Sequence, residues 1–322
     1  MYFVGIDIGG MSIKFGLVSE SGTIISKNVL RVDYATTSIE TTISLMKNKI
    51  EELCNSAKVR LSEVKGIGIG CPGVCNTDAG ILVNAPNLKW QNVNIADMFA
   101  DMRIPTFICN DANVALIGEA MFGAGQGFKD LLLLTLGTGV GGGIIINGKL
   151  FEGVGYMGGE LGHMIIELDG RECGCGHKGC LEAYASVSAL IKDTKEEMQK
   201  NPKSKMWDAC LDDINQVNGR TAFETALLGD VSANKVVDNY IKYLGEGIRN
   251  LLNIFRPEAI IIGGGLSGQK DNLIDRLDSY LESVNWGLKG TPKCKIFVSN
   301  FGNDAGIIGA AGLAMKGINN RL

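Results

Sequence analysis

A strand, a glycine-rich turn and a returning strand occur twice in this sequence. One copy covers residues 6–15 and the other covers residues 134–146, about 130 positions further along the chain. Apolar runs interrupted by glycine are typical of paired strands, and the recurrence indicates an internal duplication. A chain of 322 residues is long enough for two domains of ordinary size. We therefore expect two similar α/β lobes with a cleft between them.

Predicted strands and helices alternate along the chain. Strands are expected at 2–8, 13–18, 23–32, 66–71, 106–109, 131–136, 144–146, 259–262 and 295–298. Helices are expected at 38–56, about 112–121, 186–199, 222–228, 232–255, 273–284 and 306–315. This alternation is typical of an α/β fold. We expect residues 1–118 plus 305–322 to form one domain and residues 119–304 to form the other.

Charge and hydropathy exclude several classes of protein. The formal net charge is −4, so no general basic field attracts nucleic acid. No stretch reaches the ~18 consecutive apolar residues of a membrane span. Residues 2–8 form an apolar strand without the basic flank of a signal peptide, and most cysteines are scattered in apolar runs. We expect a cytoplasmic protein without a nucleic-acid or membrane partner.

The run 163–182, HMIIELDGRECGCGHKGCLE, has the residue types of a zinc site. It contains both histidines of the chain and three of its nine cysteines, namely His163, His177, Cys173, Cys175 and Cys180. Structural zinc takes four thiolate or imidazole ligands, often as Cys3His, and glycines between the cysteines allow the loop to fold tightly. His177 fits this ligand count less well than His163. We predict a zinc-stapled loop that carries the neighbouring carboxylates Glu160 and Glu182.

Two glycine turns have the composition of phosphate-binding hairpins. The first, Asp7 to Lys14, contains Gly9 and Gly10, whose N–H groups can face a phosphate, and Asp7 can hold Mg²⁺ through water. A plain β-hairpin explains this first turn equally well. The second turn, residues 137–143, has five glycines in seven residues, which is more than an ordinary hairpin needs. A third glycine stretch at Gly264 can cradle a nucleoside or form a generic turn.

Asp111 follows a predicted strand and begins a predicted helix. An aspartate at this place is a common helix N-cap. Alternatively, its carboxylate can accept a proton from a substrate hydroxyl at the edge of the expected cleft. Both roles remain open at the level of residue types.

Together these motifs resemble the ROK family (repressors, open reading frames and sugar kinases), from Asp7 to the region of Gly264. The most specific part is Glu160-x-Gly162-His163 followed by Cys173-x-Cys175 and Gly179-Cys180-Leu181-Glu182. The resemblance implies a two-lobed, actin-like (ribonuclease H-like) ATPase fold. It also implies a sugar kinase, most similar to bacterial glucokinases, that uses ATP and Mg²⁺ and carries structural Zn²⁺.

The resemblance implies a role for each matching residue. The zinc ligands are His163, Cys173, Cys175 and Cys180, and the general base is Asp111. The sugar contacts are Asn87, Asn110, Asp111, Glu160, His163 and Glu182. The phosphate loops contain Gly9, Gly10, Ser12, Lys14, Gly137, Thr138 and Gly139. The sequence departs from the family at Met11, where family kinases usually have threonine, although Ser12 can supply a hydroxyl.

The expected reaction is transfer of the ATP γ-phosphate to the 6-hydroxyl of a hexose, with glucose as the first choice. Fructose, N-acetylmannosamine or a β-glucoside are alternative substrates, and pocket shape decides among them. A second class, the sugar-sensing repressors of the family, carries an extra N-terminal helix-turn-helix, and residue 1 here runs directly into the first strand. The resemblance also implies a homodimer.

Overall fold

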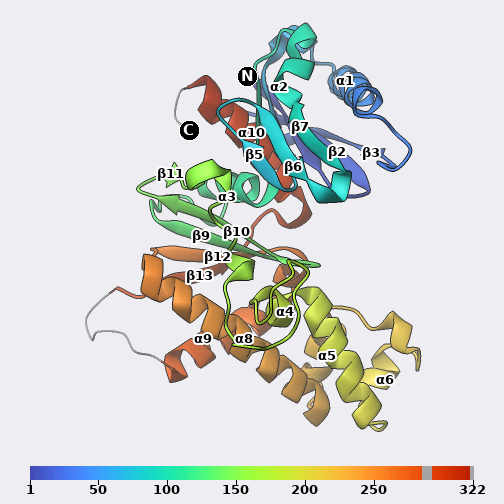
Figure 1. Ribbon diagram of the computed structural model, residues 1–322, viewed down its shortest axis with the longest axis vertical. Coiled ribbons are helices and arrows are strands. Elements are labelled where there is room, and N and C mark those ends of the chain that lie inside the picture. The colour runs from blue at the N-terminus through green and yellow to red at the C-terminus, as the bar shows by residue number, and fades with distance from the viewer. Residues whose placement is uncertain (285–291, 320–322) are drawn as a thin grey trace. The chain divides into compact units, whose positions relative to one another are not determined.

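The computed structural model describes residues 1–284 and 292–319 (Figure 1). The chain divides into two compact units. The first contains residues Met1–Lys129, Gly143–Gly159 and the segment from Asn303 onward, and the second contains Asp130–Gly142 and Glu160–Gly302. The predicted domain boundaries differ from these units at residues 119–129, 143–159 and 303–304, and the division into domains stays a proposal. Residues 320–322 of the predicted segment 305–322 lie outside the described residues.

The first unit is built on a five-stranded sheet with the order β3-β2-β1-β4-β8. Its strands are β1 (Tyr2–Ile8), β2 (Ser12–Ser19), β3 (Ile24–Arg31), β4 (Val64–Cys71) and β8 (Thr106–Asn110). β1, β2 and β3 pair antiparallel, whereas β1, β4 and β8 run parallel. Asp7 is in register with Gly70, and Cys71 is in register with Asn110. The carboxyl ends of three parallel strands therefore meet at one edge of the sheet.

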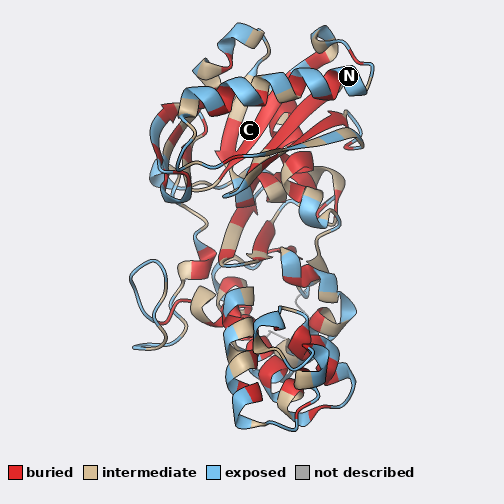
Figure 2. Ribbon diagram, turned by 90° about the vertical axis from the view of Figure 1, so that its right-hand side faces the viewer, coloured by how far each residue is buried: buried red, intermediate tan, exposed pale blue. Residues whose placement is uncertain are grey.

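Four α-helices of the first unit's described residues accompany this sheet. They are α1 (Ile39–Ser56), α2 (Ile95–Met98), α3 (Asp111–Phe122) and α10 (Ala305–Ile318). In α1, Ser38 caps the first turn by accepting from the N–H of Thr41, and a stripe of apolar residues at helical spacing is buried. The strands β1, β2 and β4 are almost wholly buried, and the sheet is mostly red in Figure 2.

Helix α10 lies unusually close to the sheet and to α3. A Cβ atom built on Gly5 would lie 1.9 Å from the carbonyl oxygen of Ile307, and one on Gly68 would lie 1.7 Å from that of Ala310. A Cβ on Gly309 would lie 1.8 Å from the carbonyl oxygen of Val114 in α3. Backbone meets backbone at these points, so only glycine fits.

A separate three-stranded sheet with the order β5-β6-β7 was not expected from the sequence. Its strands are β5 (Val74–Asn76), β6 (Ile81–Ala85) and β7 (Trp90–Asn94), and the 3₁₀ turn η2 (Pro86–Leu88) lies between the last two. Each strand has at most five residues, too few for a clear alternating pattern. This small sheet positions Asn87, which belongs to η2.

The second large sheet repeats the strand order of the first, as β11-β10-β9-β12-β13. Its strands are β9 (Leu131–Leu136), β10 (Val140–Ile146), β11 (Lys149–Leu150), β12 (Ala259–Gly263) and β13 (Lys295–Val298). β12 pairs parallel with β9 and with β13, as β4 pairs with β1 and β8. The chain passes from the second unit to the first within β10. The predicted duplication is confirmed by this shared topology.

Six α-helices complete the second unit within its described residues. They are α4 (Glu182–Ala185), α5 (Val187–Lys200), α6 (Met206–Ala209), α7 (Thr221–Leu227), α8 (Val231–Phe255) and α9 (Asp271–Ser283). The four predicted helices of this region, 186–199, 222–228, 232–255 and 273–284, are confirmed to within a few residues. Asp230 caps α8 by accepting from the N–H of Ala233.

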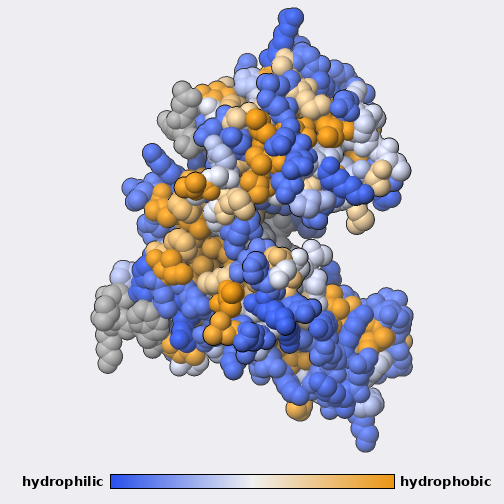
Figure 3. All heavy atoms as spheres, viewed as in Figure 1, coloured by the Kyte–Doolittle hydropathy of each residue, from blue (hydrophilic) through white to orange (hydrophobic). Residues whose placement is uncertain are grey.

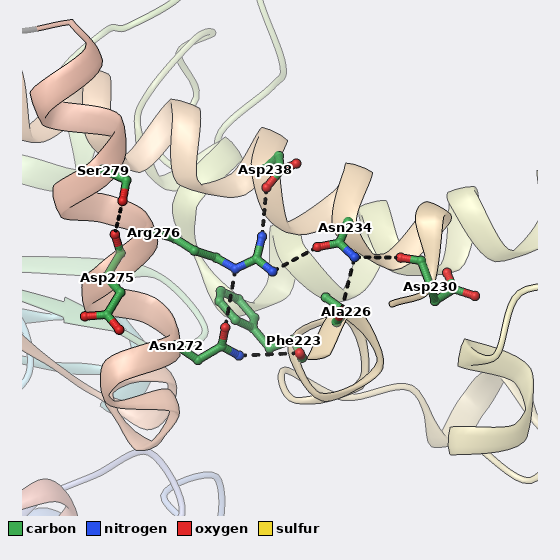
Figure 4. A network of polar contacts seen from close by, with 9 residues as sticks. All are labelled: Phe223, Ala226, Asp230, Asn234, Asp238, Asn272, Asp275, Arg276 and Ser279. Carbon is green, nitrogen blue, oxygen red and sulfur yellow. Dashed lines mark hydrogen bonds and ion pairs between the residues drawn. The ribbon is translucent and has the colours of Figure 1, made fainter. Parts of the chain in front are cut away.

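A polar network joins α8 to α9 (Figure 4). The guanidinium of Arg276 donates to Asp238 at 2.9 Å and to Asn234 at 2.9 Å on α8, and to Asn272 on its own helix at 3.3 Å. Asn272 in turn donates to the carbonyl oxygen of Phe223, which belongs to α7, at 3.4 Å. The planar guanidinium thus satisfies three acceptors at once and fixes the packing of these helices.

Among the described helices, none combines the length and the apolar character that crossing a membrane requires. On the face drawn in Figure 3, hydrophilic residues cover most of the second unit, and hydrophobic residues form separate patches. The apolar side chains of both units lie mainly inside them.

Candidate active site and metal centre

The edge of the first sheet places Asn110 and Asp111 side by side. Asn110 ends β8 and caps α3, because its Oδ1 accepts from the N–H groups of Ala112 at 2.9 Å and Asn113 at 3.2 Å. Its Nδ2 donates to the carbonyl oxygen of Gly73 at 3.1 Å. The cap is therefore Asn110, and the alternative that Asp111 caps this helix is wrong. Asp111 is the first helical residue and is exposed to solvent.

The first glycine turn closes tightly between β1 and β2. The N–H of Gly9 donates to the carbonyl oxygen of Ser12 at 2.9 Å. Asp7 and Lys14 leave the turn on facing strands and form an ion pair of 3.2 Å. Gly10 is exposed, as is Met11 with 83% of its surface. The tip of the turn is thus accessible to a ligand, while its lysine is held against the carboxylate.

The second glycine turn connects β9 to β10 and contains the exposed Thr138. The N–H of Gly137 donates to the carbonyl oxygen of Gly139 at 3.0 Å. A Cβ on Gly139 would lie 2.3 Å from Oε2 of Glu182, and the same oxygen accepts from the N–H of Val140 at 2.9 Å. Glu182 therefore supports this turn directly. The sequence singles out Glu182 but gives no signal for this contact across 42 positions.

Gly264 has a structural reason to be glycine. Its φ angle is +80°, and a Cβ there would lie 2.4 Å from the carbonyl oxygen of Leu136. The turn after β12 consequently lies beside the end of β9, where Gly137 begins the second glycine turn. Of the two roles left open for Gly264, the turn is what the geometry requires, and nucleotide binding stays a prediction.

The four predicted zinc ligands lie together in the second unit. One ligand atom from each of His163, Cys173, Cys175 and Cys180 lies within 4.8 Å of the others. The Sγ atoms of Cys175 and Cys180 are 3.6 Å apart, and Sγ of Cys173 is 3.7 Å from Nδ1 of His163. Zinc–ligand bonds of about 2.0–2.3 Å in a tetrahedron separate the ligand atoms by roughly 3.6–3.8 Å. The donor set and these two separations therefore fit a tetrahedral metal ion.

The loop around these ligands is folded by close backbone contacts. Gly179 has φ +79°, and a Cβ there would lie 1.7 Å from the carbonyl oxygen of Glu167. A hydrogen bond from the backbone of His177 is the main cause that lowers the pKa of the Cys175 thiol to about 6, which favours the thiolate. His177 itself stands outside the four-residue group and contacts Cys175 through Nδ1 at 3.6 Å.

His163 presents its two ring nitrogens to different partners. Nδ1 faces the cysteine cluster, whereas Nε2 is 4.0 Å from Oε2 of Glu160. An imidazole can bind a metal through one nitrogen and another group through the second. The arrangement leaves Nε2 and the exposed Glu160 carboxylate on the same side, away from the thiols.

The predicted sugar contacts fall into two groups, one in each unit. Asn87, Asn110 and Asp111 belong to the first unit. Glu160, His163 and Glu182 belong to the second, and Glu182 also accepts a hydrogen bond from the Cys173 thiol at 3.4 Å. The metal cluster and the second glycine turn are therefore linked through one carboxylate.

Comparisons with known proteins show to which family the chain belongs. The profile of the ROK family matches residues 3–317. The chain is 34% identical to a glucokinase from Halalkalibacterium halodurans over 317 residues, which are 98% of this chain and 95% of that relative. It also matches a solved ROK family glucokinase from Streptomyces griseus, in complex with glucose and AMPPNP, with a TM-score of 0.83 and 31% identity, covering 98% of this chain and 100% of that one. The chain belongs to the ROK family.

The family also contains relatives of another class. A xylose repressor from Caldicellulosiruptor bescii is 30% identical over 320 residues, which are 97% of this chain and 78% of the repressor. Membership of the family thus confirms the α/β fold class expected from the resemblance, while repressors as well as kinases share it.

Proposed function

We propose that this protein is an ATP-dependent hexose kinase that converts glucose to glucose 6-phosphate. The observation that carries the proposal is the position of Asp111, whose exposed carboxylate begins α3 next to the capping Asn110. Similarity to glucokinases over nearly the whole chain supports the choice of glucose.

Asp111 is the general base in this proposal. Its carboxylate accepts the proton of the sugar 6-hydroxyl while that oxygen attacks the γ-phosphorus in line. The bond from phosphorus to the bridging oxygen breaks, and ADP leaves. The N–H groups of Gly10 and Gly139, one in each glycine turn, stabilise the charge on the transferred group together with the Thr138 hydroxyl.

Asp7 is the residue that would hold Mg²⁺, because a carboxylate oxygen is the donor that this hard cation prefers. The ion supplies positive charge beside the phosphates when it is bound. Asp7 lies at the carboxyl edge of the first sheet, and its Oδ2 is bonded to Lys14. The ion pair thus places a carboxylate and an ammonium group next to each other at this edge of the sheet.

The metal centre has a role in sugar binding in this proposal. His163, Cys173, Cys175 and Cys180 would hold Zn²⁺, which supplies folding energy to a loop that has little apolar core. This loop positions the Glu160 and Glu182 carboxylates and Nε2 of His163, whose hydrogen bonds suit sugar hydroxyls. The proposal includes a cleft between two lobes, a homodimer and a cytoplasmic location.

A coupled assay over a panel of sugars tests the proposal. Glucose, fructose, N-acetylmannosamine and a β-glucoside are each offered with ATP and Mg²⁺, and polyphosphate replaces ATP in a parallel series. We expect glucose with ATP to give the highest kcat/KM. If another sugar is phosphorylated in preference to glucose, that sugar replaces glucose as the proposed substrate. If no sugar is phosphorylated, the kinase proposal fails and the repressor class, to which the xylose repressor belongs, takes its place.

A further inference from the structure

Tyr34 contacts the first glycine turn from outside the hairpin. The residue follows β3 and is half-buried. Its hydroxyl donates to the carbonyl oxygen of Gly9 at 2.9 Å. Two residues earlier, the N–H of Val32 donates to the carbonyl oxygen of Met11 at 3.3 Å. The segment after β3 therefore holds the glycine turn at two points.

The ring of Tyr34 makes a second connection, to the small sheet that carries the Asn87 loop. It packs edge-on against Trp90, with ring centroids 5.7 Å apart and an interplanar angle of 89°. Trp90 is only 3% exposed, so this support is rigid. Tyr34 also lines a pocket of about 460 Å³ together with Met11, Asn87 and Lys89. One side chain thus contacts the proposed phosphate turn and Trp90 of β7, and it lines one pocket with Asn87, a proposed sugar contact.

The contact to Gly9 controls the direction of the next N–H group. The carbonyl of Gly9 and the N–H of Gly10 belong to one planar trans peptide and point in opposite directions. Two consecutive glycines give this peptide wide freedom to rotate. A hydrogen bond on the carbonyl side therefore fixes where the N–H of Gly10 points. Burial, with smaller effects of Cys71 and Asp7, raises the pKa of Tyr34 to about 12, so the hydroxyl keeps its proton at neutral pH.

We propose that Tyr34 is a positioning residue for the phosphoryl donor, which holds the Gly9–Gly10 peptide so that the N–H of Gly10 faces the nucleotide phosphates. The inference rests on the proposed function for the identity of the donor. In this inference, the hydroxyl affects nucleotide binding through Gly9. The ring forms part of the lining of the pocket that also contains Met11 and Asn87.

The substitution Tyr34→Phe separates these two parts, because it removes the hydroxyl and keeps the ring against Trp90. Loss of one hydrogen bond predicts a rise of about 3- to 10-fold in KM for ATP and in Kd for AMPPNP. KM for glucose stays within about 2-fold, because the hydrogen bond that the hydroxyl makes among the described residues goes to the turn. Tyr34→Ala also removes the ring that lines the pocket with Asn87, and it is expected to raise KM for both substrates.

Two further measurements exclude a general loss of structure. Tyr2→Phe is the matched control, since Tyr2 packs against the same core and its hydroxyl makes no hydrogen bond to any residue that the structure describes. It should leave KM, Kd and hydrogen exchange as in the parent. In the free protein, Tyr34→Phe should speed exchange of the N–H groups of Gly9 and Val32, which donate to Ser12 and Met11.

The outcomes separate the two proposals. If the parent binds AMPPNP but phosphorylates no sugar, and Tyr34→Phe still weakens binding, the kinase proposal fails and the role of Tyr34 stands. If Tyr34→Phe binds AMPPNP and exchanges its turn amides as the Tyr2→Phe control does, the role of Tyr34 is refuted whatever the assay shows. A parent chain that binds no nucleotide refutes both.

Discussion

Thr77 donates a hydrogen bond from its hydroxyl to Oε1 of Glu152 at 2.6 Å, across 75 positions of the sequence. The same oxygen lies 3.5 Å from the thiol of Cys109, which immediately precedes Asn110 and Asp111. All of these residues belong to the first unit. Glu152 thus supports the strand end that presents the candidate base, although no motif in the sequence points to it.

The protonation of Glu152 should make stability depend on pH. Burial raises the pKa of its carboxyl, with a smaller contribution from Asp78, although the hydrogen bonds from Thr77 and Cys109 oppose the shift. The folded protein therefore holds this proton more tightly than the unfolded chain. The stabilising contribution is complete below the unfolded value near 4.5 and is lost as pH rises through the folded pKa.

The variant Glu152→Gln tests this expectation, because it cannot lose a proton. Its free energy of unfolding should fall less than that of the parent as pH rises from about 4.5 to 7. Denaturant unfolding at several pH values measures the difference, and Glu196→Gln, on the exposed side of α5, is the matched control. Parallel pH profiles of the parent and Glu152→Gln would contradict the assignment.

Replacing Asp111 should remove the proton acceptor and leave the fold intact. We expect Asp111→Asn to lower kcat by ~10²–10⁴-fold, the range for a lost general base. The helix cap belongs to Asn110, so thermal unfolding should change little, and the variant should still bind glucose. A coupled assay measures kcat, calorimetric titration measures glucose binding, and a thermal melt measures stability. Unchanged turnover would remove Asp111 from the mechanism.

The cysteine cluster should hold zinc in the purified protein. Elemental analysis is expected to find stoichiometric zinc in the parent and little in Cys180→Ser, which removes one of the four ligands. The variant should also unfold at a lower temperature, because a structural metal contributes folding energy. Cys294→Ser, outside the cluster, should keep its metal. Equal zinc contents in the two variants would argue against this ligand set.

Gly68 should be the most sensitive of the glycines that contact α10. A Cβ there would lie 1.7 Å from the carbonyl oxygen of Ala310, so Gly68→Ala forces the helix away from the sheet. We expect a loss of about 1–3 kcal/mol or more in the free energy of unfolding. Gly268→Ala is the control, since a Cβ there meets nothing within 4 Å, and it should stay within about 0.5 kcal/mol. Similar losses for both variants would show that close packing is not the cause.

Local patterns sufficed to predict much of this protein. The apolar run at residues 131–136 and the helical spacing at 38–56 identified β9 and α1, because the residues that define such elements are neighbours in the chain. The cluster of His163 and three cysteines was predictable for the same reason, since the cysteines lie within eight positions. The short strands β5, β6 and β7 were not predicted, because three to five residues are too few to show an alternating pattern of apolar and polar residues.

The sequence by itself determined the repeated strand–glycine turn–strand units, the cysteine cluster and the aspartate at the start of a helix. Only the tertiary structure decided that Asn110 caps α3 and that Glu182 bonds the second glycine turn. It also decided that Tyr34 holds the first turn and that Thr77 meets Glu152. The physical reason is the distance along the sequence over which each interaction acts. Propensity, capping and ligand spacing act over a few residues. A hydrogen bond across 25 or 75 positions depends on how the sheets and helices pack.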